Sequence, residues 1–112
     1  MTATTKSREK PETPAVAGDL EIARDGGVLV LTLSRPDRRN ALSSSMLAAL
    51  QEALDAGASD AGVRVIIIAA KGPAFSAGHD LKEITQHRAD PDKGRAFTEG
   101  LMHQCSKVMR TV

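Results

Sequence analysis

The sequence predicts an α/β domain in which a β-hairpin leads into a β-α-β crossover. Two apolar stretches, residues 20–22 and 28–33, flank the turn residues Asp25, Gly26 and Gly27, which is the pattern of a hairpin. Apolar residues then recur at spacings of three and four between residues 46 and 57, as in an amphipathic helix. The β-branched run at residues 63–69 is too short for a helix and predicts a further strand. Strand, helix and strand in this order form a right-handed crossover.

Length and composition limit the possible partners. The chain has 112 residues, with 15 Lys and Arg against 14 Asp and Glu, and it has two Phe but no Trp or Tyr. This balance lacks the basic excess and the aromatic stacking surfaces of a nucleic-acid binder. The longest apolar run is too short to cross a bilayer. A single Cys favours a reducing compartment, so we expect a cytoplasmic protein with neither a nucleic-acid nor a membrane partner.

The N-terminal segment, residues 1–18, mixes Thr, Lys, Glu and Pro without apolar periodicity. Such a composition buries too little surface to offset the ordering entropy, so we expect a disordered tail followed by a domain at residues 19–112. The tail has no apolar segment of the kind that a secretory signal requires.

The hairpin is expected to end at Pro36, which supplies no ladder donor and keeps Arg35 out of the helical region. A polar loop at residues 37–40 follows. Ser43, Ser44 or Ser45 can then cap the predicted helix. The apolar positions of this helix are Met46, Leu47, Leu50, Ala53, Leu54 and Gly57.

The strand at residues 63–69 is expected to be buried on both faces, because it lacks alternating polar residues. The expected core between the helix and the sheet contains Leu50, Leu54, Ile66, Ile68 and Phe75.

The C-terminal part is expected to contain a loop at residues 70–80, a short helix at 81–87 and a longer amphipathic helix. Asp90 is the expected cap of that last helix, with Pro91 at its first position. Its apolar stripe consists of Phe97, Leu101, Cys105, Val108 and Val112. No later strand arrives to cover this stripe, so we expect it to be exposed and to promote association.

The loop at residues 72–81 is rich in small residues, which let a backbone approach a ligand closely and leave amides free to hold an oxyanion. An ordinary turn, in which Gly78 relaxes φ and Asp80 caps the short helix, explains the same residues. A Ser76, His79 and Asp80 triad is disfavoured because the Gly-x-Ser-x-Gly pattern is absent. The histidines also lack the spacing of metal ligands, so we expect no metal.

Three segments resemble the enoyl-CoA hydratase/isomerase, or crotonase, family. They are residues 33–42 (LSRPDRRNAL), 63–68 (VRVIII) and 74–83 (AFSAGHDLKE), and the resemblance covers residues 19–112. His79 after Gly78 and the C-terminal helix are most similar to the enoyl-CoA hydratase domain-containing proteins of that family. The resemblance implies a crotonase-like spiral of β-α-β units, truncated here, that assembles into homotrimers or hexamers when intact.

The resemblance also implies a site for acyl-CoA thioesters, with CoA as part of the substrate and no separate cofactor. The backbone N–H of His79 would be one of two donors to the thioester oxygen, and such donors contribute about 3 kcal/mol each. The loop residues that would line the ligand are Ala77, Gly78, His79, Asp80, Leu81 and Lys82. Arg38, Arg39 and Ala41 match CoA-contact positions, although both arginines fit solvated loop charges equally well.

The family's second oxyanion amide and its acid/base carboxylates match no position in this chain. We therefore expect an N-terminal portion of a crotonase-like lyase, most similar to hydratases of 2-enoyl-CoA, with isomerase, hydrolase or decarboxylase activity as alternatives, and inactive by itself. The other function left open is a non-catalytic remnant that binds CoA weakly or associates with crotonase-family subunits.

Overall fold

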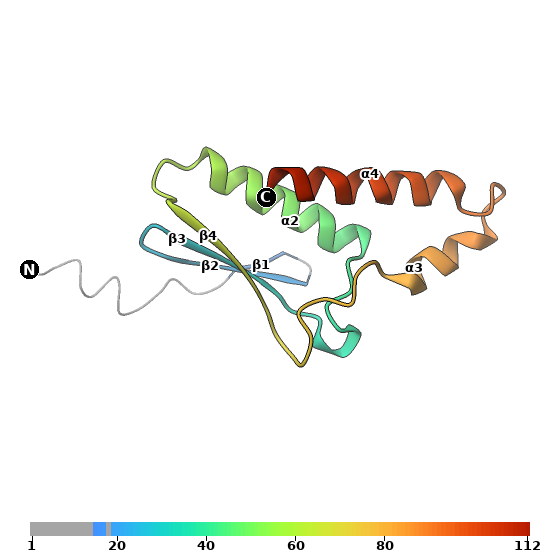
Figure 1. The fold of residues 1–112 in the computed structure, drawn as a ribbon, viewed down its shortest axis with the longest axis horizontal. Helices are drawn as coiled ribbons and strands as arrows, with labels where there is room; N and C mark the ends of the chain where they lie inside the picture. The colour runs from blue at the N-terminus through green and yellow to red at the C-terminus, as the bar shows by residue number, and fades with distance from the viewer. Residues whose placement is uncertain (1–14, 18) are drawn as a thin grey trace, which may run out of the picture.

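The described part of the chain is built around a four-stranded sheet with two long helices stacked over one of its faces (Figure 1). The structure is a computed structural model and describes residues 15–17 and 19–112. The strands are β1 (Ala15–Ala17), β2 (Leu20–Asp25), β3 (Val28–Leu33) and β4 (Val65–Ala70). The helices are η1 (Pro36–Arg38), α2 (Ser44–Ser59), α3 (Leu81–Gln86), η2 (His87–Ala89) and α4 (Arg95–Thr111).

The sheet confirms the predicted hairpin and crossover. Strands β2 and β3 pair antiparallel from Leu20↔Leu33 to Asp25↔Val28, and Gly26 takes a φ of 60° in the turn between them. Strand β4 pairs parallel to β3 after the α2 crossover. The order in the sheet is β1-β2-β3-β4, so the carboxyl ends of β3 and β4 meet at one edge.

Helix α2 lies against the sheet as its apolar spacing predicts. Ser43 is the N-cap, and its Oγ accepts a hydrogen bond from the Met46 N–H at 3.1 Å. The buried residues of α2 are the predicted ones, Met46, Leu47, Leu50, Ala53, Leu54 and Gly57. A Cβ on Gly57 would stand 2.8 Å from Leu29 Cδ2, so a larger residue where α2 approaches β3 would require the Leu29 side chain to move.

Ala15–Ala17, which were predicted to be disordered, instead form β1 and pair antiparallel with β2. The edge of β2 supplies hydrogen-bond partners that composition alone does not reveal. Residues 1–14 and 18, which the prediction of disorder also covers, lie outside the described residues.

Strand β4 is not buried on both faces, and this prediction was wrong. Val65 is 51% exposed and Ile67 46%, while Ile66 packs partly buried against the core on the face toward α2. The reason is that β4 is the last strand of the described sheet and only one of its faces is covered. Phe75, also predicted in the core, is 59% exposed in the loop after β4, whereas Leu50 and Leu54 are buried as predicted.

Helix α4 begins later than predicted, at Arg95. Gly94 before it has a φ of 84°, a left-handed conformation that interrupts a helix. The carboxylate of Asp92 accepts hydrogen bonds from the Gly94 and Ala96 N–H groups, whereas Asp90 pairs with His87 Nδ1 at 2.8 Å. Asp92 rather than Asp90 therefore stabilises the start of α4.

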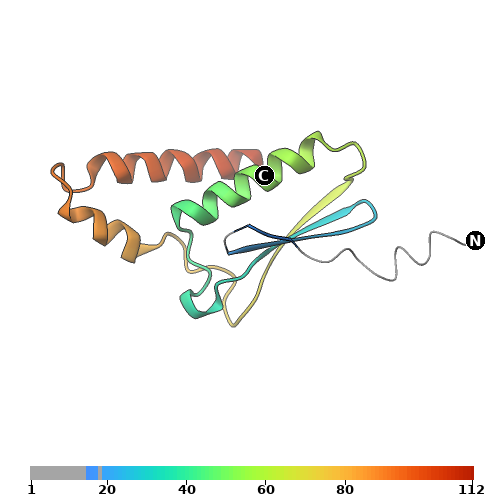
Figure 2. The ribbon, with the colours of Figure 1, turned by 180° about the vertical axis from the view of Figure 1, so that it is seen from behind.

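The apolar stripe of α4 is covered, contrary to expectation. Helix α4 packs along α2 on the side away from the sheet, as both views of the ribbon show (Figures 1 and 2). Leu101 and Val108 are buried, Phe97 and Cys105 are partly buried, and Val112 at the end is exposed. Helix α2 thus supplies the cover that the prediction assigned to later strands. Among the described residues, no helix is long and apolar enough to span a membrane.

Candidate functional site

Two loops meet at the edge where β3 and β4 end, and they carry most of the predicted site residues. The loop after β3 runs through residues 34–43, and the loop after β4 runs through residues 71–80. Three backbone hydrogen bonds join them: Ala77 N to Arg39 O at 2.9 Å, Leu42 N to Gly78 O at 2.7 Å and Asp80 N to Leu42 O at 3.1 Å. The loops therefore form one continuous surface rather than two separate segments.

We call the line of these three hydrogen bonds the seam between the loops. The His79 backbone N–H points away from the seam. Leu42 and His79 form an isolated parallel bridge, and that bridge uses the carbonyl of Gly78 and the N–H of Asp80. Within residues 15–17 and 19–112, no hydrogen bond uses the N–H of His79. A backbone N–H at the edge of such a bridge can donate a hydrogen bond to a ligand oxygen.

Gly78 leaves space beside this donor. Its φ is 94°, which favours glycine, and apart from its chain neighbours Ala77 and His79 none of the described residues has an atom within 4 Å of the place where a Cβ would stand. A side chain here would strain the backbone and narrow the approach to His79. The sequence also allowed an ordinary turn, in which Gly78 adopts a positive φ and Asp80 caps the short helix. The structure shows this turn, and it shows the His79 N–H, free of partners among the described residues, in the same loop.

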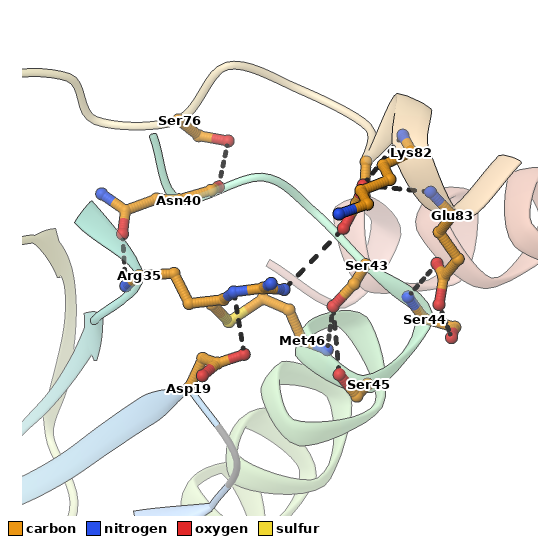
Figure 3. A network of polar contacts seen from close by, with 11 residues as sticks. Asp19, Arg35, Asn40, Ser43, Ser44, Ser45, Met46, Ser76, Lys82 and Glu83 are labelled. Carbon is orange, nitrogen blue, oxygen red and sulfur yellow. Dashed lines mark hydrogen bonds and ion pairs between the residues drawn. The ribbon is translucent and has the colours of Figure 1, made fainter. Parts of the chain in front are cut away.

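A polar pocket of about 220 Å³ lies beside the seam, between the first turns of α2 and α3. Arg38 and Lys82, two predicted CoA contacts, line it together with Arg35. Arg35 is held in place by Asp19 at 3.2 Å (Figure 3). A second carboxylate, that of Asp80, lies 3.8 Å from the Arg35 guanidinium. Arg38 and Lys82 form no ion pair with the described residues, so their charges can meet an anionic ligand.

The two carboxylates near His79 are held by the protein itself. Asp80 is 7% exposed, and its Oδ1 accepts from the N–H groups of Lys82 and Glu83 at the start of α3. Glu83 accepts from the Ser44 N–H at 2.8 Å and from the Ser44 hydroxyl at 2.7 Å, as Figure 3 shows. Each carboxylate thus stabilises a helix start.

The remaining predicted residues lie around the same surface. Arg39 is exposed and takes a φ of 54°, and Leu81 is 73% exposed. Ala41 is partly buried, and its N–H donates to the Arg38 carbonyl at 3.2 Å. Ala77 is exposed in the loop between β4 and His79.

Sequence reasoning missed Asn40. This side chain is 0% exposed and bonds to both loops, with its Oδ1 accepting from the Arg35 N–H at 2.7 Å. The only signal in the sequence is that asparagine tolerates the left-handed conformation seen here, with a φ of 52°. Ser76 was considered only as a triad member, but its hydroxyl donates to the Asn40 carbonyl at 2.9 Å.

Two other features border the loops. An apolar pocket of about 200 Å³ is lined by Phe75 and Ser76 together with residues of β3, β4 and the end of α4.

The first residues of the two loops, Ser34 and Lys71, both bond to the Glu21 carboxylate of β2. These bonds hold the pKa of the Glu21 carboxyl below its usual range. No cluster of three metal-ligating side chains occurs in the part of the chain that the structure describes.

Comparison with known proteins identifies the family of this chain. The sequence profile of the enoyl-CoA hydratase/isomerase family matches residues 23–111. The chain belongs to this family. Human enoyl-CoA hydratase domain-containing protein 3, mitochondrial, is 41% identical over 102 residues, which make up 91% of this chain and 30% of the human protein. Putative enoyl-CoA hydratase EchA13 of Mycobacterium tuberculosis is 43% identical over 80 residues, or 69% of this chain and 25% of that protein.

Solved structures of the enoyl-CoA hydratase/isomerase family confirm the predicted crotonase-like fold. An enoyl-CoA hydratase of Mycobacterium smegmatis superposes with a TM-score of 0.74 at 47% identity, over 84% of this chain and 35% of that one. Human enoyl-CoA hydratase domain-containing protein 3 superposes with a TM-score of 0.71 at 37% identity, over 82% of this chain and 34% of that one. This chain spans about a third of the length of these relatives.

Proposed function

We propose that this chain binds the thioester end of an acyl-CoA, and that the His79 N–H donates a hydrogen bond to the thioester oxygen. The observation that carries this proposal is the His79 amide, which the Leu42 bridge leaves without a partner among the described residues beside the open space at Gly78. A fixed backbone donor stabilises negative charge on that oxygen because it needs no reorganisation when the charge develops.

The polar pocket suits the phosphate-bearing part of CoA. Arg38 and Lys82 line it, and the nearby carboxylates of Asp80 and Glu83 are already engaged by backbone N–H groups. The cationic groups are therefore available to phosphate oxygens. The apolar pocket beside Phe75 and Ser76 belongs to the same loop as His79 and suits the acyl chain.

For the whole protein, we propose hydration of a 2-enoyl-CoA, by family membership, within homotrimers or hexamers. Isomerase, hydrolase and decarboxylase activities are the alternatives within the same family. No cofactor is required in this proposal, because CoA is part of the substrate. The cytoplasmic location stays a prediction.

The test compares two ligands that differ at one oxygen. Butyryl-CoA carries the thioester carbonyl, whereas the thioether S-butyl-CoA lacks it. We expect butyryl-CoA to bind about two- to tenfold more tightly in calorimetry, as one additional hydrogen bond would provide. Equal affinities would contradict a thioester contact, and the absence of binding by both ligands would contradict the whole proposal.

A second function, association with crotonase-family subunits, is favoured by a different observation. Strand β4 is an edge of the described sheet, and its Val65 and Ile67 side chains are about half exposed. Exposed strand edges invite pairing with another chain. Sedimentation of the chain alone and mixed with a family trimer tests this function, and a chain that stays monomeric in both samples would exclude it.

A further inference from the structure

Asn40 connects the end of β3 to the loop that leads to His79. Its Nδ2 donates to the Lys71 carbonyl at 2.8 Å and to the Ala74 carbonyl at 3.0 Å. Its Oδ1 accepts from the Arg35 N–H, so both polar atoms of the side chain are engaged. A fully buried amide with all these bonds is stable only while the two loops stay together.

The Asn40 backbone extends the connection toward the site (Figure 3). Its carbonyl accepts from the Ser76 hydroxyl at 2.9 Å, and the Ser76 Oγ in turn accepts from the Gly78 N–H at 3.2 Å. A continuous path of hydrogen bonds therefore leads from Asn40 to the residue preceding His79.

The two loops are in close contact near Asn40, at Pro36 and Gly72. A Cβ on Gly72 would stand 2.6 Å from Pro36 Cβ, so a larger residue would separate the loops. The Asn40 side chain bonds to loop backbone only and to none of the helices. Its contacts thus fix the relative position of the loops rather than the packing of the core.

We propose that Asn40 is a positioning residue: it holds the loop at residues 71–78 against the loop after β3 and so fixes where the His79 N–H points. This inference rests on the proposed function for its importance in binding. Its geometric part, the fixing of the loop, can be tested without any ligand.

The test measures amide hydrogen exchange in the full chain at neutral pH. In Asn40→Asp, a carboxylate of nearly the same shape faces two carbonyls and cannot donate to them. We expect the protection of the Ala77 and Asp80 amides to fall about tenfold or more, since two hydrogen bonds are lost, while the β2–β3 pairing stays protected. Leu54→Ala is the control, because it weakens α2 in the core and should lower protection there instead.

Ser76→Ala is the milder second variant, since it removes only the hydroxyl between Asn40 and Gly78. We expect it to lower the protection of Ala77 and Asp80 alone, so the link that the Asn40 carbonyl makes to the loop through Ser76 is tested even where Asn40→Asp does not fold. Unchanged protection at these two amides in the folded variants, or an equal loss over the whole chain, would overturn the proposal.

Ligand binding separates this inference from the proposed function. In Asn40→Asp, we expect the preference for butyryl-CoA over S-butyl-CoA to disappear while the affinity for S-butyl-CoA stays the same. A merely structural role would weaken both ligands equally, which would overturn positioning. If the unaltered chain shows no preference, the thioester contact fails, and the exchange measurements still decide whether Asn40 fixes the loop.

Discussion

At the scale of single residues, Asp92 shows how one carboxylate sets the start of a helix. It accepts hydrogen bonds from the Ala96 and Gly94 N–H groups, and these bonds hold its pKa below its usual range. A carboxyl with a lowered pKa in the folded state stabilises that state above its unfolded pKa of about 3.9 and loses this contribution as the pH falls through the folded value.

Asp92→Asn should therefore be less stable than the unaltered chain at neutral pH, because the neutral amide accepts these bonds more weakly. The difference between the two free energies of unfolding should shrink as the pH falls from about 4 through the lowered pKa of Asp92, below which the carboxyl is neutral in both states. Urea unfolding at a series of pH values measures it. A difference that stays constant down to pH 2 would show that the carboxylate charge does not matter here.

Arg38 and Lys82 are the residues that should govern the affinity for CoA. Because both are partly or fully exposed, we expect Arg38→Ala and Lys82→Ala each to weaken butyryl-CoA binding about two- to fivefold, less so at high salt. Arg95→Ala is the matched control, since Arg95 pairs with Glu99 on α4. Calorimetry at two salt concentrations measures the change, and an equal effect of the control would indicate a non-specific charge effect.

At the scale of elements, the packing of α4 on α2 is what the sequence did not predict. Leu101→Ala should lower the free energy of unfolding by about 2–5 kcal/mol, because Leu101 is buried in that contact. Met102→Ala, at a neighbouring position that is 41% exposed, should change it by less than about 0.5 kcal/mol. Equal losses in denaturant unfolding would mean that α4 does not pack in this way in solution.

The sequence predicted the hairpin and α2, because these elements depend on neighbouring residues. It did not predict which side chains of the loops are buried, because that depends on contacts between distant residues. The turn at Gly26 and the spacing of Leu50 and Leu54 are properties of neighbouring residues, so the hairpin and α2 follow from the sequence. The exposure of Phe75 depends on what covers β4, and the burial of Asn40 depends on two loops meeting across residues distant in the sequence. The sequence pattern contains neither kind of information.

At the scale of the whole molecule, we expect this chain to bind an acyl-CoA without hydrating it. Hydration requires a group that activates water and delivers a proton, and such groups contribute about 10²- to 10⁴-fold each. Asp80 and Glu83 are both held by backbone donors at helix starts. Purified chain mixed with crotonyl-CoA should show no loss of enoyl absorbance above the buffer rate. Turnover that Gly78→Pro abolishes would show that a group in this chain transfers the proton.

The position of the His79 N–H can be followed directly by nuclear magnetic resonance of the ¹⁵N-labelled chain. Butyryl-CoA should move the His79 amide resonance downfield, as a new hydrogen bond to the thioester oxygen does, and S-butyl-CoA should leave that resonance in place while shifting the signals of Arg38 and Lys82. A His79 resonance that responds equally to both ligands, or to neither while they bind, would contradict the thioester contact.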